Sequence, residues 1–281
     1  MTTQTVAITL TLILLVFVFK PKYQLIPFVL CAVFVPADQR VIVAGLDFTP
    51  LRLMVLSGFL SLVMRGHPLH IRLNTFDKLV LAWGACGAAI YIMQWMNVKA
   101  VINRSGFLFD VIGLYWLFRL HLSTWNDFER LARTFALCAL ALAPLVALEW
   151  ATGQNPFAKL GTVGTVVREG RYRCQASFPH SIMMGVFWVG LLPVFAGLAY
   201  TRRSSLYWAA AAATVFMAIA TASSTPVAAL GVVLLVLPLY RFRHRVPMAA
   251  KLGVVGLFML HLVMKAPVWH LISRIDLVGG S

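Results

Sequence analysis

The chain has 281 residues, of which 60% are hydrophobic and only 12% are charged, and its mean hydropathy is +0.85. Soluble domains carry roughly 25% charged and about 45–50% apolar residues, so the composition excludes a soluble globular domain and predicts a polytopic membrane protein. A net charge of +15 would favour a nucleic-acid partner in a soluble protein. Here the basic residues lie in short segments between apolar runs, as in membrane proteins, and we expect no nucleic-acid binding.

The N-terminus and the cysteines exclude two further classes. Residues 1–5 contain no basic residue, and no small-residue cleavage site follows the first apolar run, so we expect a retained membrane helix rather than a signal peptide. Cys31, Cys86 and Cys138 lie in apolar runs, where cysteine behaves as a small hydrophobe. Only Cys174 lies in a polar segment, and no CxxC spacing occurs. We therefore expect neither a metal site nor a cofactor.

Apolar runs approaching the roughly 17–25 residues of a spanning helix recur along the whole chain. They predict an all-α transmembrane bundle of about nine to ten spanning helices in residues 1–265. In chain order the expected helices are 5–19, 23–37, 51–64, 79–96, 107–120, 133–150, 178–200, 206–221, 227–240 and 249–265. The connections include a charged segment at 119–133, the long polar loop 151–177 and a tight turn at 222–225.

The basic residues also predict which side each loop faces. Fourteen of the 24 Lys and Arg residues fall in the odd-numbered loops, and loops rich in these residues tend to be cytoplasmic. On this assignment the 151–177 loop and residues 266–281 face the opposite, periplasmic side.

A few ionisable residues lie in or beside apolar runs, notably Asp110, His121, Glu149 and His261. Charges in hydrocarbon are costly and often functional. Most of these residues lie near predicted helix ends, where an interfacial position explains them, so we favour a structural role for Asp110 and Glu149.

The densest polar chemistry precedes the seventh expected helix. Arg168, Arg171 and Arg173 lie in the 151–177 loop, and Pro179 follows near the start of the next apolar run. Arginine binds phosphate through parallel hydrogen bonds. Proline is common in the first turn of a helix, and helix N-termini also bind anions. The arginines could form a site for an anionic, lipid-borne substrate or anchor the loop to lipid headgroups, and spacing alone does not separate these interpretations.

A sequence resemblance favours the substrate site. A recurring pattern of the O-antigen ligase and O-antigen polymerase-like membrane protein family resembles the stretch Arg173-Cys-Gln-Ala-Ser-Phe-Pro-His180-Ser-Ile-Met-Met-Gly185, followed by Leu191-Leu-Pro193. Ser181 stands where proline is common. The turn 221–225 resembles the family's Ser-rich turn without its frequent arginine, and 274–281 resembles the opening of its large periplasmic loop. The resemblance extends from about Leu79 to the last residue.

The resemblance implies a multi-pass glycosyltransferase of the bacterial inner membrane that needs no metal. Its donor would be an undecaprenyl-diphosphate-linked glycan, and its acceptor a hydroxyl of lipid A-core or of another polysaccharide chain. Arg173 would be the catalytic residue that holds the diphosphate leaving group, and Arg171, His180 and Arg274 would also bind substrate. For His180 we favour an alternative role, capping backbone groups at the helix start, and Arg274 could instead be a membrane-surface anchor.

Other possibilities stay open at the sequence level. The family's remaining functional arginine and histidine lie in the large periplasmic loop, which residues 266–281 only begin, so we expect a truncated chain, which alone could be active or inactive. Ligase and polymerase activities are not separated. A lipid-linked glycan flippase or transporter, which would need a charged path through the bundle, and a non-catalytic membrane scaffold are the alternatives.

Overall fold

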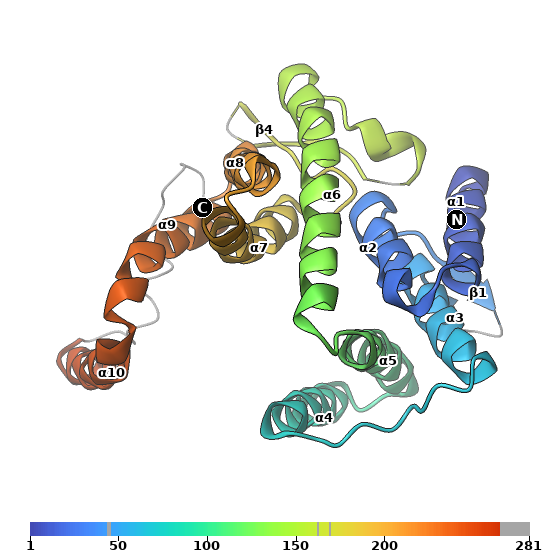
Figure 1. The fold of residues 1–281 in the computed structure, drawn as a ribbon, viewed down its shortest axis with the longest axis horizontal. Helices are drawn as coiled ribbons and strands as arrows, with labels where there is room; N and C mark the ends of the chain where they lie inside the picture. The colour runs from blue at the N-terminus through green and yellow to red at the C-terminus, as the bar shows by residue number, and fades with distance from the viewer. Residues whose placement is uncertain (44–45, 162, 169, 265–281) are drawn as a thin grey trace. The chain divides into compact units, whose positions relative to one another are not determined.

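The computed structural model describes residues 1–43, 46–161, 163–168 and 170–264 (Figure 1). The chain divides into two compact units. Unit 1 comprises Met1–Cys138, Phe157–Val163 and Ser177–Pro179, and unit 2 comprises Ala139–Pro156, Gly164–Ala176 and the chain from His180 onward.

Unit 1 consists of apolar helices and one short hairpin. Its elements in order are α1 (Thr3–Val18), the 3₁₀ turn η1 (Pro21–Tyr23), α2 (Leu25–Phe34), β1 (Val41–Val43), β2 (Leu46–Phe48), α3 (Pro50–Met64), α4 (Thr75–Trp95), α5 (Val98–His121), the first half of α6 (Trp125–Thr152) and the 3₁₀ turn η2 (Pro156–Lys159). Strands β1 and β2 pair antiparallel.

The core of unit 1 lies among α1, α2, α3 and α5, and includes the buried side chains of Val16, Phe28, Met54 and Leu117. Gly58 of α3 permits this packing, because a Cβ atom there would lie 2.7 Å from Phe28 Cζ and 2.9 Å from Leu117 Cδ1.

Unit 2 contains the second half of α6, the strands β3 (Val166–Arg168) and β4 (Arg171–Arg173), and the helices α7 (Ser181–Arg202), α8 (Ser205–Ala220), α9 (Ser224–Leu239) and α10 (Val246–Val263). Helix α7 packs on α8 and α9, and Trp188, Phe195 and Met217 are fully buried there. A 3₁₀ segment, η3 (Tyr240–Arg245), joins α9 to α10 at a kink at Phe242 (Figure 1).

The described helices indicate a membrane-embedded protein. Five are long and apolar enough to cross a bilayer, namely α4, α5, α6, α7 and the helical run Ser224–Val263. Four shorter apolar helices, Thr3–Val18, Pro21–Phe34, Pro50–Met64 and Ser205–Ala220, accompany them. The all-α prediction is therefore confirmed at the level of a helical membrane protein, and the number of nine to ten spans stays a prediction.

Two predicted helix starts are wrong because N-caps extend the helices. The fifth helix starts at Val98 rather than near 107, since the Asn97 side chain accepts a hydrogen bond from Ala100 N at 2.7 Å. The sixth starts at Trp125 rather than near 133, since Thr124 and Asp127 form a reciprocal capping box. The supposed charged connector 119–133 is thus mostly helix.

Two further predictions concern the polar loop 151–177 and the segment 266–281. The 151–177 loop was expected without regular structure, yet it contains η2 and the antiparallel β3–β4 hairpin. The segment 266–281, with Arg274, lies outside the described residues.

Candidate functional site

The β3–β4 hairpin carries all three arginines of the 151–177 loop on one face. Its register pairs Val166 with Arg173 and Arg168 with Arg171. Directly opposed residues share a face of a hairpin, as do residues two apart on one strand. Arg168, Arg171 and Arg173 therefore project to the same side, and Tyr172 projects to the other. The arrangement places three guanidinium groups on one face of the hairpin.

Arg173 is the buried member of this group. Its exposed fraction is 9%, and its Nε atom is buried without a hydrogen-bond partner among the described residues. Burial, and secondarily the charge of Arg168, lower the pKa of the Arg173 guanidinium, because both disfavour the charged form. Buried charges are ordinarily paired, so the protein holds here a cation that an anion would stabilise.

The guanidinium of Arg104 in α5 provides a comparison, because it also has a buried atom without a hydrogen-bond partner but makes other contacts. Its Nε is also buried without a partner. Its guanidinium carbon, however, lies 5.0 Å from the ring centroid of Tyr91 and 4.5 Å from that of Phe107. These cation–π contacts stabilise Arg104, and no such ring contact is found for Arg173 in the described structure.

A fully buried carboxylate, that of Glu149 near the end of α6, organises the backbone next to Arg173. It accepts four hydrogen bonds, from Asn155 Nδ2 (3.2 Å), Thr165 Oγ1 (3.0 Å), Gln175 N (3.1 Å) and Ala176 N (2.9 Å). Asn155 Nδ2 also donates to Ala176 O at 2.9 Å. We call these five residues the Glu149 cluster. In all four contacts the Glu149 carboxyl oxygens are the acceptors.

The residues between Arg173 and the cluster are fixed as well. Cys174 is fully buried, and its N–H donates to Ala220 O at the end of α8 (3.2 Å). Burial, reinforced by the nearby Glu149 carboxylate, raises the pKa of the Cys174 thiol to about 12. Ala176 has a left-handed backbone, φ +50°, which costs about 1–2 kcal/mol for a residue with a Cβ. The two consecutive N–H groups bound to Glu149 maintain this conformation.

The opposite face of the hairpin packs on the end of α6. Gly153 has φ +68°, and its N–H donates to Glu149 O at 2.8 Å, which terminates the helix. A Cβ atom at this glycine would lie 2.4 Å from Tyr172 Cε1. The glycine thus serves both the left-handed helix end and the close approach of the tyrosine ring.

The structure locates three of the four predicted site residues. Arg171 and Arg173 lie on one face of β4, the first exposed and the second buried. His180 is the N-cap of α7, where its Nδ1 accepts from Ile182 N at 3.3 Å, so the favoured capping role is observed. Sequence reasoning missed the backbone-organising role of Glu149, because its partners Asn155, Thr165 and the 175–176 backbone lie between 6 and 27 residues further along the chain.

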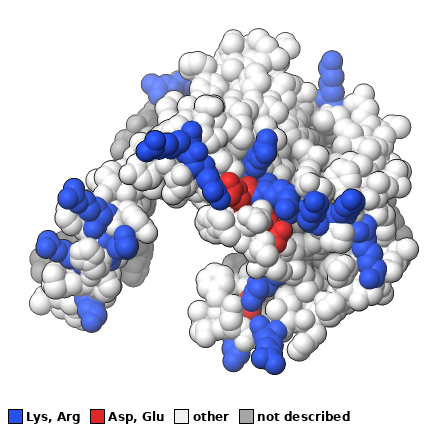
Figure 2. Space-filling model, in the orientation of Figure 1, with Lys and Arg blue, Asp and Glu red and all other residues white. Residues whose placement is uncertain are grey.

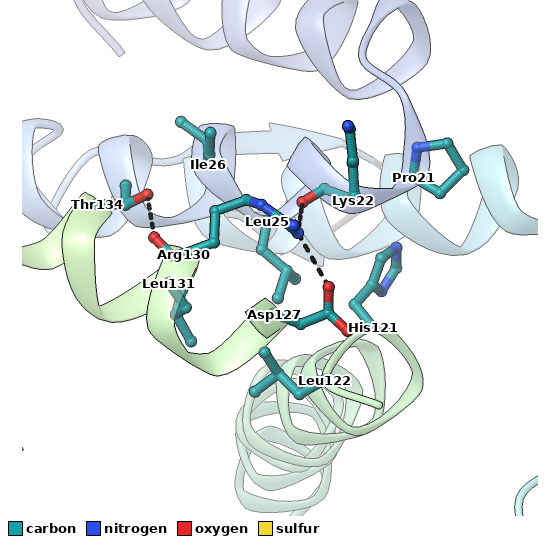
Figure 3. A pocket seen from close by; sticks show the side chains of 10 residues that line it. All are labelled: Pro21, Lys22, Leu25, Ile26, His121, Leu122, Asp127, Arg130, Leu131 and Thr134. Carbon is teal, nitrogen blue, oxygen red and sulfur yellow. Dashed lines mark hydrogen bonds and ion pairs between the residues drawn. The ribbon is translucent and has the colours of Figure 1, made fainter. Parts of the chain in front are cut away.

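Unit 1 contains two cavities, and several polar side chains in their walls are hydrogen-bonded within the protein. The first, about 20 Å³, suits roughly one water molecule. In its wall Arg130 Nη1 donates to Lys22 O and to Asp127 Oδ1, both at 2.9 Å (Figure 3). The adjoining cavity, about 480 Å³, includes His67, His70, Arg119 and His121. His121 is bonded to Gln24, and Arg119 lies 3.4 Å from Asp77, so neither cavity presents an unpartnered buried charge.

Within the described part of the chain, no group of three or more His, Cys, Asp or Glu side chains is placed to hold a metal ion. Comparison with protein-family models, curated proteins and solved structures found no match. The geometry of the Arg173 hairpin and the sequence resemblance are therefore the observations that point to a function.

Proposed function

We propose that the chain is a membrane glycosyltransferase of the O-antigen ligase/polymerase type. It would transfer a glycan from an undecaprenyl-diphosphate carrier to a hydroxyl of lipid A-core or of another polysaccharide chain, at the periplasmic face of a bacterial inner membrane. The observation that supports this most is Arg173, a buried guanidinium with an unpartnered Nε beside two further arginines on the same hairpin face.

The proposed reaction replaces one bond at the anomeric carbon by another. The bond to the diphosphate oxygen breaks, the acceptor hydroxyl oxygen forms a new bond to the same carbon, and the hydroxyl proton is released. The bonding electron pair leaves with the diphosphate. Arg173 would stabilise that developing charge by charge-assisted hydrogen bonds in a partly desolvated position, and the exposed Arg171 would contribute longer-range attraction. Among the described Lys and Arg residues, Arg104 also has a buried Nε without a hydrogen-bond partner, but its guanidinium lies over the rings of Tyr91 and Phe107.

Substitution of Arg173 tests the proposal. Arg173→Gln should lower glycan transfer by about 10²–10³-fold, since an electrostatic donor to a leaving group contributes on this order. Transfer is measured as glycan attached at the cell surface, together with the amount of lipid-linked donor, which should accumulate in the periplasmic leaflet of the inner membrane. Lys159→Gln removes an exposed charge from the same loop and should change neither quantity.

The outcomes separate the proposed function from its alternatives. Normal attachment in Arg173→Gln would refute the catalytic role. Accumulation of donor on the cytoplasmic side would instead favour a flippase. Direct binding gives a third readout: farnesyl diphosphate, but not farnesol, should raise the thermal stability of the purified wild type and leave Arg173→Gln unchanged.

A further inference from the structure

Arg173 has no side-chain partner of its own in the described structure, so its position must come from the backbone that follows it. Three consecutive N–H groups after Arg173 are bonded: Cys174 N to Ala220 O, and Gln175 N and Ala176 N to Glu149. Two of these three bonds end on one carboxylate.

The Glu149 carboxylate also accepts hydrogen bonds from residues on both sides of the β3–β4 hairpin. Thr165 immediately precedes β3, and Gln175 follows two residues after the end of β4. Asn155 links Glu149 to Ala176 O, so the backbone of Ala176 is held through both its N–H and its carbonyl group. A carboxylate with four donors on it forms strong, charge-assisted hydrogen bonds. The two ends of the hairpin therefore have a common attachment point at the end of α6.

We propose that Glu149 is the positioning residue of this site: its carboxylate fixes the β3–β4 hairpin so that the Arg173 guanidinium is held buried and ready for a diphosphate. This inference rests on the proposed function for the identity of the anion, but the positioning itself does not. Glu149 is buried among donors and does not touch the substrate. It acts through the backbone of residues 174–176.

Cys174 reports the position of this backbone independently of any activity. Its thiol is fully buried, and burial keeps its pKa near 12, so it should resist a water-soluble maleimide at pH 7.5, because the thiolate is the reactive form. In a Cys86→Ser background, Cys31 and Cys138 remain buried within helices. Labelling then measures how often the 174–176 backbone leaves its place.

The experiment compares Glu149→Gln, Asn155→Ala and the control Gln154→Ala, whose side chain is exposed beside the cluster. Glu149→Gln should increase the Cys174 labelling rate by roughly tenfold or more, since losing one charge-assisted hydrogen bond changes an opening equilibrium on this order. Asn155→Ala retains the Glu149 charge and should give a smaller increase, which excludes a mere loss of negative charge beside the thiol. Gln154→Ala should label like the wild type.

A second readout distinguishes positioning from general stability. Variants that elute as single species with unchanged helical circular dichroism are tested for stabilisation by farnesyl diphosphate, which Glu149→Gln should lose although Arg173 is intact. Unchanged labelling in Glu149→Gln would overturn the proposal, and so would increased labelling with undiminished stabilisation by the diphosphate. If the wild type itself is not stabilised, the proposed function fails, while Cys174 labelling still decides whether Glu149 fixes the hairpin.

Discussion

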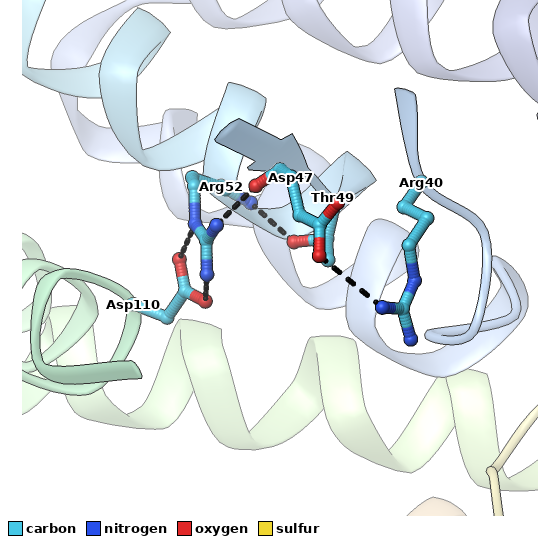
Figure 4. Close-up of polar contacts among 5 residues, drawn as sticks. All are labelled: Arg40, Asp47, Thr49, Arg52 and Asp110. Atoms are coloured by element: carbon cyan, nitrogen blue, oxygen red, sulfur yellow. Dashed lines mark hydrogen bonds and ion pairs between the residues drawn. The ribbon is translucent and has the colours of Figure 1, made fainter. Parts of the chain in front are cut away.

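The ion pair between Arg52 and Asp110 joins α3 to α5 inside unit 1. Arg52 Nε donates to Asp110 Oδ1 at 2.9 Å and Arg52 Nη2 to Oδ2 at 2.6 Å, a bidentate geometry (Figure 4). Arg52 Nη1 also donates to Asp47 O. Gly106 permits the close approach, because a Cβ there would lie 2.8 Å from Arg52 Nη2. Both charged groups are about four-fifths buried, at 17% and 20% exposure, so their mutual satisfaction matters to stability.

We predict that Arg52→Gln lowers the free energy of unfolding by about 1.5–3 kcal/mol, because it leaves the Asp110 carboxylate with weaker partners in a partly buried position. The double variant Arg52→Gln/Asp110→Asn should lose less than the sum of the two single variants. Denaturant unfolding in detergent, followed by tryptophan fluorescence, measures these differences.

The neighbouring pair of Arg40 and Asp47 provides the matched control. These side chains lie 3.2 Å apart but are 59% and 47% exposed (Figure 4). Arg40→Gln should therefore change the unfolding free energy by less than about 1 kcal/mol. Equal losses for Arg40→Gln and Arg52→Gln would show that burial does not determine the contribution of these pairs.

The residues near the start of α7 could be predicted from the sequence. That the Arg173 Nε atom has no hydrogen-bond partner among the described residues could not. The sequence predicts a backbone-capping role for His180 near the start of a helix at 178–200, and the structure makes it the N-cap because α7 begins at Ser181. Which of three arginines is buried depends on the tertiary packing of a hairpin that the sequence did not reveal. The resemblance selected Arg173, and its burial and unpartnered Nε are consistent with that choice without testing it.

Between the helices of unit 2, α7 lies close to the end of α8 and to the first turn of α9. A Cβ atom at Gly185 would lie 2.5 Å from Pro226 Cβ and 2.9 Å from Thr221 Cγ2. Both neighbours are stiff or buried, since proline has a closed ring and Thr221 is fully buried. The helices can pack this closely only because position 185 has no side chain.

We predict that Gly185→Ala destabilises the protein by about 1–3 kcal/mol through overpacking. Gly190→Ala on the same helix is the control, because nothing lies within 4 Å of its Cβ position. It should be neutral or stabilising by about 0.5–1 kcal/mol, the gain in helix propensity from glycine to alanine. Thermal unfolding of the two variants in one detergent compares them directly, and similar effects would contradict the close contact.

The positions of the helices could be predicted from apolar runs, but their starts could not. Lys99, Asn103 and Arg104 belong to the first turns of α5, although their polarity argued against a helix there. The Asn97 cap and the favourable geometry of a long helix outweigh that polarity. Similarly, the short strands β3 and β4 contain no long alternating pattern, so only their pairing with each other defines them.

At the scale of the whole chain, the basic residues divide the loops into two sets. Figure 2 shows basic side chains gathered on the η3–α10 segment with no acidic side chain among them, and η3 itself contributes Arg241, Arg243 and Arg245. This segment belongs to the set that the sequence assigns to the cytoplasm, and the 151–177 loop belongs to the other. Three helices, α7, α8 and α9, separate them.

The sidedness of these segments tests whether α8 crosses the membrane. Its 16 residues span about 24 Å, less than a hydrocarbon core of about 30 Å. If all three helices cross, Lys159→Cys should react with an impermeant maleimide added to intact spheroplasts, and Arg243→Cys should react only in inverted vesicles. The Cys86→Ser parent provides the background. Labelling of both residues from one side would mean that α7, α8 and α9 do not all span.

The Glu149 cluster limits the substitutions that this part of the sequence can accept during evolution. Glu149 binds side chains at 155 and 165 and backbone at 175 and 176, while Gly153, between them, has no tolerance for a side chain. An exchange of the carboxylate for an apolar residue removes four hydrogen bonds at once, so divergence here has to proceed by joint replacement of several positions or not at all. Distant relatives should thus be recognisable less by the length of their apolar helices than by a glutamate, a glycine four residues later and an asparagine two beyond it, ahead of the arginine hairpin.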